Sequence, residues 1–129
     1  MPHITALRQL KRVIKNTPDD LLHMDKWAGT ARCGTVRCAA GWAAVDPWFN
    51  EHGFTAHPGG SPTYAGKWPF DSLRAFFRLT GAATDHLFAI DHPGLPGGHA
   101  VSKRQILNQI DRIIAGEPTH HYRIRKPAP

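Results

Sequence analysis

The fold is decided by residues 35–45, which read Thr-Val-Arg-Cys-Ala-Ala-Gly-Trp-Ala-Ala-Val. Arg37 is the only charged residue of this stretch, and small or apolar side chains fill most other positions. A helix that is apolar nearly all round is normally buried. Thr35 is a suitable N-cap, and Asp46-Pro47 ends the pattern because proline lacks a backbone donor and restricts its predecessor. The sequence therefore predicts a buried central helix over residues 36–45.

Two amphipathic helices are expected at the ends of the chain. The first covers residues 3–16, and its apolar positions recur with helical spacing. These positions are Leu7, Leu10, Val13 and Ile14. The second begins at a capping box formed by Ser102 and Gln105 and ends at Gly116, followed by Pro118. Its apolar face consists of Ile106, Leu107, Ile110, Ile113 and Ile114. Both helices should pack on the central one.

The remaining segments are shorter. Thr17-Pro18-Asp19-Asp20 predicts the start of a helix that reaches Trp27, because it supplies an N-cap, a proline and two carboxylates for the first turn. Residues 28–34 are expected to form a turn. Residues 58–62 are rich in proline and glycine and separate residues 54–56 from residues 63–65, which indicates a small hairpin. A helix over 71–80 stops at Gly81, a short helical turn covers 85–88, and 91–100 form a loop.

These elements predict a mainly α fold, a compact helical domain of four to five helices with a small β-hairpin. The chain has 129 residues, which suits one domain. We expect a single helical domain over 1–118 and a basic C-terminal tail over 119–129. No apolar run is long enough for a bilayer and no charged segment leads into a signal-like one, so we expect a cytoplasmic protein without membrane contact.

Positive charge is concentrated at the two ends. Residues 17–116 hold nine bases and nine acids, whereas residues 1–16 hold four bases and no acid. The bases of the first helix share one face, and three further bases lie in the tail. The predicted binding residues are Arg8, Lys11, Arg12, Lys15, Arg123, Arg125 and Lys126. Such a surface fits an acidic protein or a phosphate backbone. We favour a protein or protein complex, since no nucleic-acid recognition motif is visible.

A cysteine box is the most distinctive motif of the chain. It reads Cys33-Gly34-Thr35-Val36-Arg37-Cys38-Ala39-Ala40-Gly41-Trp42 and is preceded by Trp27. It resembles a C-G-T-x-x-C-x-A-G-W box of small, uncharacterised proteins of bacteriophages and of actinobacteria and other bacteria. The resemblance brings no settled activity. It implies a small accessory protein of phage origin that acts inside a bacterial host cell.

Four interpretations of the box remain open. In the favoured one the cysteines are small buried residues, and Gly41 with the alanines lets a neighbouring helix approach beside Trp27 and Trp42. In the second, Cys33 and Cys38 form a disulfide, although a cytosolic setting argues against it. In the third, the same two cysteines bind zinc, with His52 and His57 as the nearest completion of four ligands.

The fourth interpretation is catalytic. A cysteine near a helix N-terminus and beside arginines has a lowered pKa. Cys33 would then be the nucleophile of a hydrolase or transferase, with His92 as its base and Asp91 next to that base. The phosphate-binding, dinucleotide-binding, nucleophile-elbow and H-E-x-x-H motifs are missing from the sequence, which removes most support for nucleotide-dependent and zincin-type reactions.

The sequence favours a non-enzymatic accessory protein without a cofactor. We expect it to bind a host macromolecule, with a protein slightly favoured, through the basic first helix and tail. The alternatives are a nucleic-acid-binding protein that contacts phosphates and the Cys33 enzyme. If a pocket exists, the loops over 50–69 and 91–100 are its natural place, because they carry aromatic and histidine side chains. These are His57, Tyr64, Trp68, His92 and His99.

Overall fold

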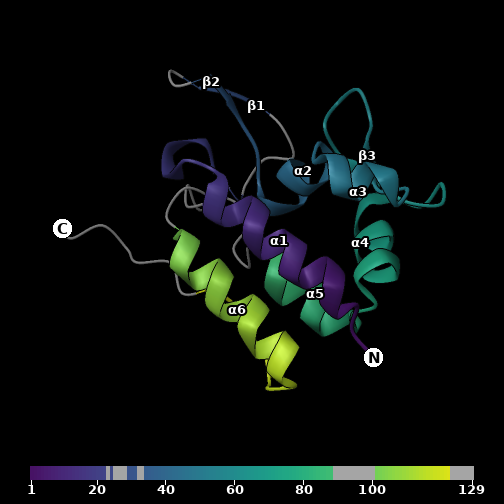
Figure 1. Cartoon of the computed structure of the whole chain (residues 1–129), viewed down its shortest axis with the longest axis vertical. Helices are drawn as coiled ribbons and strands as arrows, with labels where there is room; N and C mark the ends of the chain where they lie inside the picture. Colours follow the sequence, from purple (N-terminus) through teal and green to yellow (C-terminus); the bar gives the residue numbers. More distant parts are fainter. Residues whose placement is uncertain (23, 25–28, 32–33, 89–100, 123–129) are drawn as a thin grey trace.

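The structure is a computed structural model that describes residues 1–22, 24, 29–31, 34–88 and 101–122. Its helices are α1 (Ile4–Asn16), α2 (Ala39–Ala44), α3 (Pro47–Glu51), α4 (Pro69–Phe77), α5 (Gly81–Phe88) and α6 (Lys103–Ala115). Its strands are β1 (Gly29–Ala31), β2 (Gly34–Val36), β3 (Thr55–Ala56) and β4 (Pro62–Thr63), which pair as two antiparallel hairpins. The mainly helical fold class with a small hairpin is confirmed (Figure 1).

Helix α1 forms as its apolar spacing predicts. Leu7, Leu10 and Ile14 are fully buried, and Val13 packs on the edge of the core. The first helical residues are tied to α4, because the amide of His3 donates a hydrogen bond of 2.9 Å to the carbonyl of Phe77. The helix ends at Asn16, after which the Thr17 hydroxyl donates to the Val13 carbonyl at 2.7 Å. The apolar face of α1 therefore faces the core, and its opposite face is left for the bases.

Helix α6 lies antiparallel to α1 (Figure 1). Its N-terminus carries the predicted capping box, in which the Ser102 hydroxyl accepts from the Gln105 amide and the Gln105 side chain accepts from the Ser102 amide. Its C-terminus is capped by Gly116 in the left-handed conformation, with φ of 75°. A glycine adopts that conformation without steric cost. Both ends of α6 were therefore predicted correctly from the sequence.

The region before the central helix differs from the expectation. The predicted turn over 28–34 and the predicted N-cap at Thr35 are wrong, because residues 29–31 and 34–36 pair as β1 and β2. Thr35 and Val36 are β-branched, which favours a strand over a helix start. The predicted helix to Trp27 is only a 3₁₀ turn, Asp19–Leu21, within the described residues. The Arg37 amide then donates to the Leu21 carbonyl at 3.1 Å, so the chain becomes helical only after Arg37.

Helix α2 is shorter than predicted. Cys38 is its N-cap, and the Cys38 sulfur accepts a hydrogen bond from the Gly41 amide at 3.4 Å. The predicted end at Asp46-Pro47 is confirmed, but the same two residues also start α3. Asp46 Oδ2 accepts hydrogen bonds from the amides of Trp48 and Phe49, and Pro47 occupies the first helical turn. Helix α3 was not predicted from the sequence, and it follows α2 directly because Asp46 and Pro47 both end one helix and start the next.

The second half of the chain contains the predicted hairpin, where Thr55 pairs with Thr63. Helix α4 ends at Phe77 rather than Thr80, because Arg78 takes the left-handed conformation with φ of 54°. Gly81 does not end this helix but begins α5. The Thr80 hydroxyl accepts from the Ala83 amide at 3.1 Å, so Thr80 caps the start of α5. The loop predicted over 91–100 lies outside the described residues.

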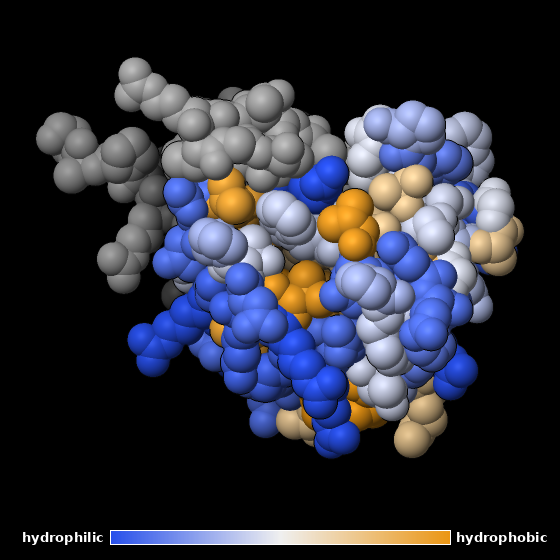
Figure 2. Space-filling model, turned by 45° about the horizontal axis from the view of Figure 1, so that its top comes forward, coloured by the Kyte–Doolittle hydropathy of each residue, from blue (hydrophilic) through white to orange (hydrophobic). Residues whose placement is uncertain are grey.

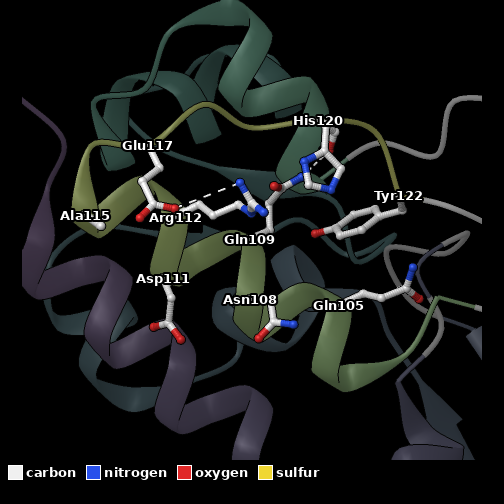
Figure 3. A pocket seen from close by; sticks show the side chains of 9 residues that line it. All are labelled: Gln105, Asn108, Gln109, Asp111, Arg112, Ala115, Glu117, His120 and Tyr122. Atoms are coloured by element: carbon white, nitrogen blue, oxygen red, sulfur yellow. Dashed lines mark hydrogen bonds and ion pairs between the residues drawn. The ribbon is translucent and has the colours of Figure 1, made fainter.

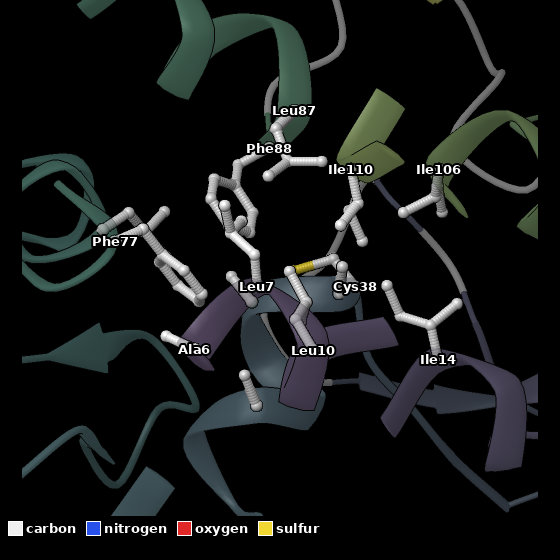
Figure 4. Close-up of a cluster of buried hydrophobic side chains, with 14 of the residues drawn as sticks. Ala6, Leu7, Leu10, Ile14, Cys38, Phe77, Leu87, Phe88, Ile106 and Ile110 are labelled. Atoms are coloured by element: carbon white, nitrogen blue, oxygen red, sulfur yellow. The ribbon is translucent and has the colours of Figure 1, made fainter. Parts of the chain in front are cut away.

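The core lies between α1, α2, α4, α5 and α6. Phe49, Phe54 and Phe77 are fully buried, and the rings of Phe49 and Phe54 lie 5.6 Å apart. Figure 4 shows the Cys38 sulfur pointing into the apolar cluster formed by α1 and α6 residues. On the face drawn in Figure 2, hydrophilic side chains form broad areas around small hydrophobic patches. Within the part of the chain that the structure describes, no helix has the length and apolar character needed to span a bilayer.

Candidate binding surface

The predicted basic stripe of α1 exists, but its four bases are not equivalent. Arg8, Arg12 and Lys15 are exposed. Lys11 is half-buried and forms an ion pair with Asp111 of α6, with 2.6 Å between Nζ and Oδ1. Among the described residues, no ion pair joins the other three bases to an acid. Three of the four predicted bases are therefore available to a partner.

Helix α6 adds bases to the same face, which the sequence did not predict. A groove of about 690 Å³ runs between α1 and the first turns of α6. Its charged lining consists of Lys11, Lys15, Asp19, Lys103, Arg104 and Asp111. Its apolar lining consists of Leu22, Val101 and Leu107. We call this surface, together with Arg8 and Arg12 on the neighbouring turns of α1, the α1–α6 groove. Bases outnumber acids there, and the floor between them is apolar.

Lys103 has a structural task in this groove. Its ammonium group donates to the Thr17 carbonyl at 2.5 Å and to the Lys15 carbonyl at 3.4 Å, and it lies 3.2 Å from Asp19 Oδ1. A cation at the carboxyl end of a helix satisfies carbonyls that have no partner inside the helix. Lys103 therefore fixes the end of α1 against the start of α6.

Arg104 has no such task among the described contacts. It is exposed in the first turn of α6, where no acidic residue is present. The amino end of a helix carries partial positive charge, so an arginine there is mildly destabilising. This placement strengthens the positive potential at the mouth of the α1–α6 groove at a small cost in stability.

The predicted tail bases Arg123, Arg125 and Lys126 lie outside the described residues. The segment before them is packed on the domain. Tyr122 is 9% exposed, and its hydroxyl donates to the Leu87 carbonyl at 2.7 Å. Burial raises the pKa of Tyr122 well above its usual range, so the phenol stays protonated as a donor. The sequence did not predict this buried contact, because a single tyrosine in a basic tail carries no signal of burial.

A second pocket, of about 480 Å³, lies beside this contact (Figure 3). Gln109 is 3% exposed there, and its amide nitrogen donates to the carbonyls of His86 and His120. Arg112 lies 3.9 Å from Glu117 and also donates to the Pro118 carbonyl. These contacts close the end of α6 onto the segment that follows it. The pocket is therefore lined by residues that hold the segment 117–122 against α6.

The cysteine box is a structural element where the structure describes it. Gly41 is buried in α2, and the indole nitrogen of Trp42 donates to the Leu21 carbonyl at 2.9 Å. The guanidinium of Arg37 lies 5.3 Å from the centre of the Trp42 ring. Gly34 and Thr35 belong to β2, whereas Trp27 and Cys33 lie outside the described residues. The described part of the box joins the β1–β2 hairpin to the core.

The candidate catalytic residues Cys33, Asp91 and His92 all lie outside the described residues. The zinc hypothesis stays a prediction as well, since Cys33 is one of its ligands. Of the other ligands, Cys38 caps α2, and His57 is exposed. His52 stacks on Trp48 with 4.1 Å between ring centres, and its Nδ1 lies 2.7 Å from the Trp48 carbonyl oxygen. Among the described residues, no group of three metal-ligating side chains is found.

Comparison of the chain with protein-family models, with curated proteins and with solved structures finds no significant match.

Proposed function

We propose that the protein is a non-enzymatic accessory protein that binds an acidic surface of a bacterial host protein through the α1–α6 groove. One observation carries the proposal, namely that two helices from opposite ends of the chain bring their bases to the rim of one apolar groove. Charge complementarity at a rim steers association, and apolar burial at the centre supplies affinity. The tail bases Arg123, Arg125 and Lys126 stay predicted binding residues for the same partner.

The lining of the groove favours a protein over a nucleic acid. Leu22, Val101 and Leu107 offer apolar contacts that a phosphate backbone cannot use. Single-stranded nucleic acids bind on aromatic platforms, and the described residues that line this groove include no aromatic side chain. An acidic segment of a protein with one or two apolar side chains fits both the rim and the floor.

The setting of this function comes from the cysteine box. Its resemblance to small bacteriophage and bacterial proteins supports a phage-derived accessory role in the cytoplasm of a bacterial host. A binding protein of this kind acts by occupying a surface of its target, so it needs no cofactor and no reacting group.

The test is affinity purification of the tagged full chain from a bacterial lysate, with and without nuclease and at two salt concentrations. We expect one host protein to be retained in stoichiometric amount after nuclease treatment and to be released at higher salt. The variant Arg12→Glu, Lys15→Glu, Arg104→Glu should lose this protein. None of the three side chains is buried, so the variant should fold normally.

The matched control is Lys67→Glu, Arg74→Glu, Arg78→Glu, which reverses the same number of exposed charges just before α4, within it and at its C-cap. This control should retain the host protein. Equal loss of the host protein in both variants would show that binding depends on net charge and not on the position of the bases. Retention of nucleic acid alone, removed by nuclease, would refute the protein-binding proposal.

A further inference from the structure

A second basic surface lies on α4. Lys67, Arg74 and Arg78 are exposed and line a shallow pocket of about 400 Å³ together with a single acid, Asp71. Arg74 lies within α4, Lys67 precedes the helix, and Arg78 is its C-cap. Among the described residues, no ion pair neutralises these three bases. They therefore form a cluster of exposed cations in and next to α4.

Trp68, which follows Lys67 directly in the chain, adds an exposed aromatic ring at the start of α4. Its side chain is 81% exposed, whereas Trp42 and Trp48 are half-buried in contacts with the fold. Phe70, two residues further on, is 38% exposed. A large aromatic side chain that stays in water contributes nothing to the core, which makes it a candidate for ligand contact.

The backbone around Trp68 is held rigidly. The Ser72 amide donates to the Trp68 carbonyl at 2.7 Å, and the Ser72 hydroxyl donates to the Lys67 carbonyl at 3.0 Å. The Lys67 amide donates in turn to the Tyr64 carbonyl at 3.1 Å. Because Trp68 precedes Pro69, its backbone is confined to the extended region, and its ψ is 158°. The indole is therefore presented from a fixed backbone, which lowers the entropy cost of binding.

We propose that Trp68 and the α4 bases form a binding site for single-stranded nucleic acid. A base stacks on the indole of Trp68, and the flanking phosphates pair with Lys67, Arg74 and Arg78. Stacking of bases on aromatic side chains beside a row of cations is the usual physical basis of single-strand binding. The site does not rest on the proposed function, since none of its residues lies in the α1–α6 groove.

The surroundings of Trp68 favour this ligand over a protein pocket or a membrane surface. A protein hot spot needs a ring of contacts that excludes water. Insertion into a membrane surface needs a broad apolar face. The chain neighbours Ala65, Gly66 and Lys67 are exposed and small or charged, and Phe70 is 38% exposed, so together they form neither a closed ring of contacts nor a broad apolar face. A stacked base needs one face of a ring and cations for the flanking phosphates, and residues 67–78 supply the exposed Trp68 and three exposed bases.

The test is a titration of a fluorescently labelled short oligodeoxythymidine with the full chain, followed by anisotropy at low and at physiological salt. Wild type should bind the oligonucleotide, and Trp68→Ala should weaken binding about 10-fold because one base no longer has a ring to stack on. Trp68→Phe is the matched control and should keep most of the affinity, because it retains a ring. The Trp68 side chain is exposed and lies outside the core, so both variants should show the circular dichroism of wild type.

Three results would overturn the proposal. The first is no binding of the oligonucleotide at low salt, and the second is an unchanged affinity in Trp68→Ala. The third is stronger Trp68-dependent binding to anionic phospholipid vesicles than to the oligonucleotide, which would assign the surface to membranes. A duplex of the same length should compete poorly, because its bases are stacked inside and cannot reach the indole.

Discussion

The α1–α6 groove and the α4 surface carry the same kind of charge but differ in what surrounds it. In the groove the bases border an apolar floor that includes Leu107, and two of them are already paired with Asp111 and Asp19. Around α4 the bases share one chain segment, residues 67–78, with the exposed ring of Trp68. Positive charge attracts many kinds of partner, whereas the neighbouring apolar or aromatic groups select among them. We therefore propose a protein as the partner of the groove and a single strand as the partner of the α4 surface.

The largest effect is expected from removing cations of the α4 surface. Arg74→Ala with Arg78→Ala should weaken oligodeoxythymidine binding by about 10-fold for each arginine that is removed, because each pairs with a phosphate. The slope of log affinity against log salt should fall by about 1.4, since each phosphate that is paired on a single strand contributes about 0.7. Titrations at several salt concentrations measure both values. Arg8→Ala with Arg12→Ala is the charge-matched control, and an equal change of slope in that pair would remove the distinction between the two surfaces.

Moving an aromatic ring from α4 to the α1–α6 groove should move single-strand binding with it. Asn108 is exposed on α6, one turn after Arg104 and in the lining of the groove. In a Trp68→Ala background, Asn108→Trp should restore roughly 10-fold in oligodeoxythymidine affinity, because a ring again stands beside cations. Asn108→Leu, which adds apolar surface without a ring, should restore none. A restoration by leucine as large as that by tryptophan would show that stacking is not what selects the single strand.

A smaller effect is expected at Tyr122, which lies in neither the α1–α6 groove nor the α4 surface. Tyr122→Phe leaves the Leu87 carbonyl without its donor and should lower the free energy of unfolding by about 1 kcal/mol. Because burial raises the pKa of Tyr122 in the folded protein, the unfolded chain ionises first as pH rises above about 10, the usual value for tyrosine. Wild-type stability should be fully present below that pH and fall above it.

Urea unfolding at several pH values measures this. The Phe variant should lack the part of the alkaline loss that Tyr122 causes, while oligonucleotide and host-protein binding stay unchanged. The same alkaline loss in both proteins would argue that the phenol is not buried as described.

The smallest effect is expected within the α1–α6 groove, where Lys103 stabilises the fold and Arg104 is available to a partner. Lys103→Ala should cost about 1 kcal/mol in unfolding free energy, since it removes two hydrogen bonds to the end of α1 and an exposed ion pair. Arg104→Ala should change stability by less than about 0.5 kcal/mol, because the arginine faces solvent at the unfavourable end of the helix dipole. Host-protein capture should be reduced by Arg104→Ala. A larger stability loss at Arg104 than at Lys103 would reverse this assignment.

The sequence predicted the elements whose signals are local. The apolar spacing of α1, the capping box at Ser102 and the glycine at 116 each act within a few residues, so they could be recognised without the rest of the chain. The boundary between β2 and α2 could not be recognised in this way. It depends on the pairing of β2 with β1 and on the hydrogen bond between Arg37 and Leu21. Thr35 suits a helix cap and a strand equally, and only tertiary pairing decides between them.

The binding surfaces show the same limit. The stripe of α1 could be predicted because its bases lie on one helix. Its enlargement by Lys103 and Arg104 could not, since it depends on the antiparallel packing of two helices from opposite ends of the chain. The sequence indicated Trp68 only by composition, as an aromatic residue of a loop suited to lining a pocket. Its exposure follows from the hydrogen bonds of Ser72 and Lys67.

The most direct test of two independent surfaces is a displacement experiment. The tagged chain, loaded with its captured host protein, is titrated with oligodeoxythymidine, and both bound components are quantified. We predict a complex that holds both, from which Trp68→Ala removes only the oligonucleotide and Arg12→Glu, Lys15→Glu, Arg104→Glu removes only the protein. Stoichiometric displacement of the host protein by the oligonucleotide would contradict the account, because it would show one shared surface.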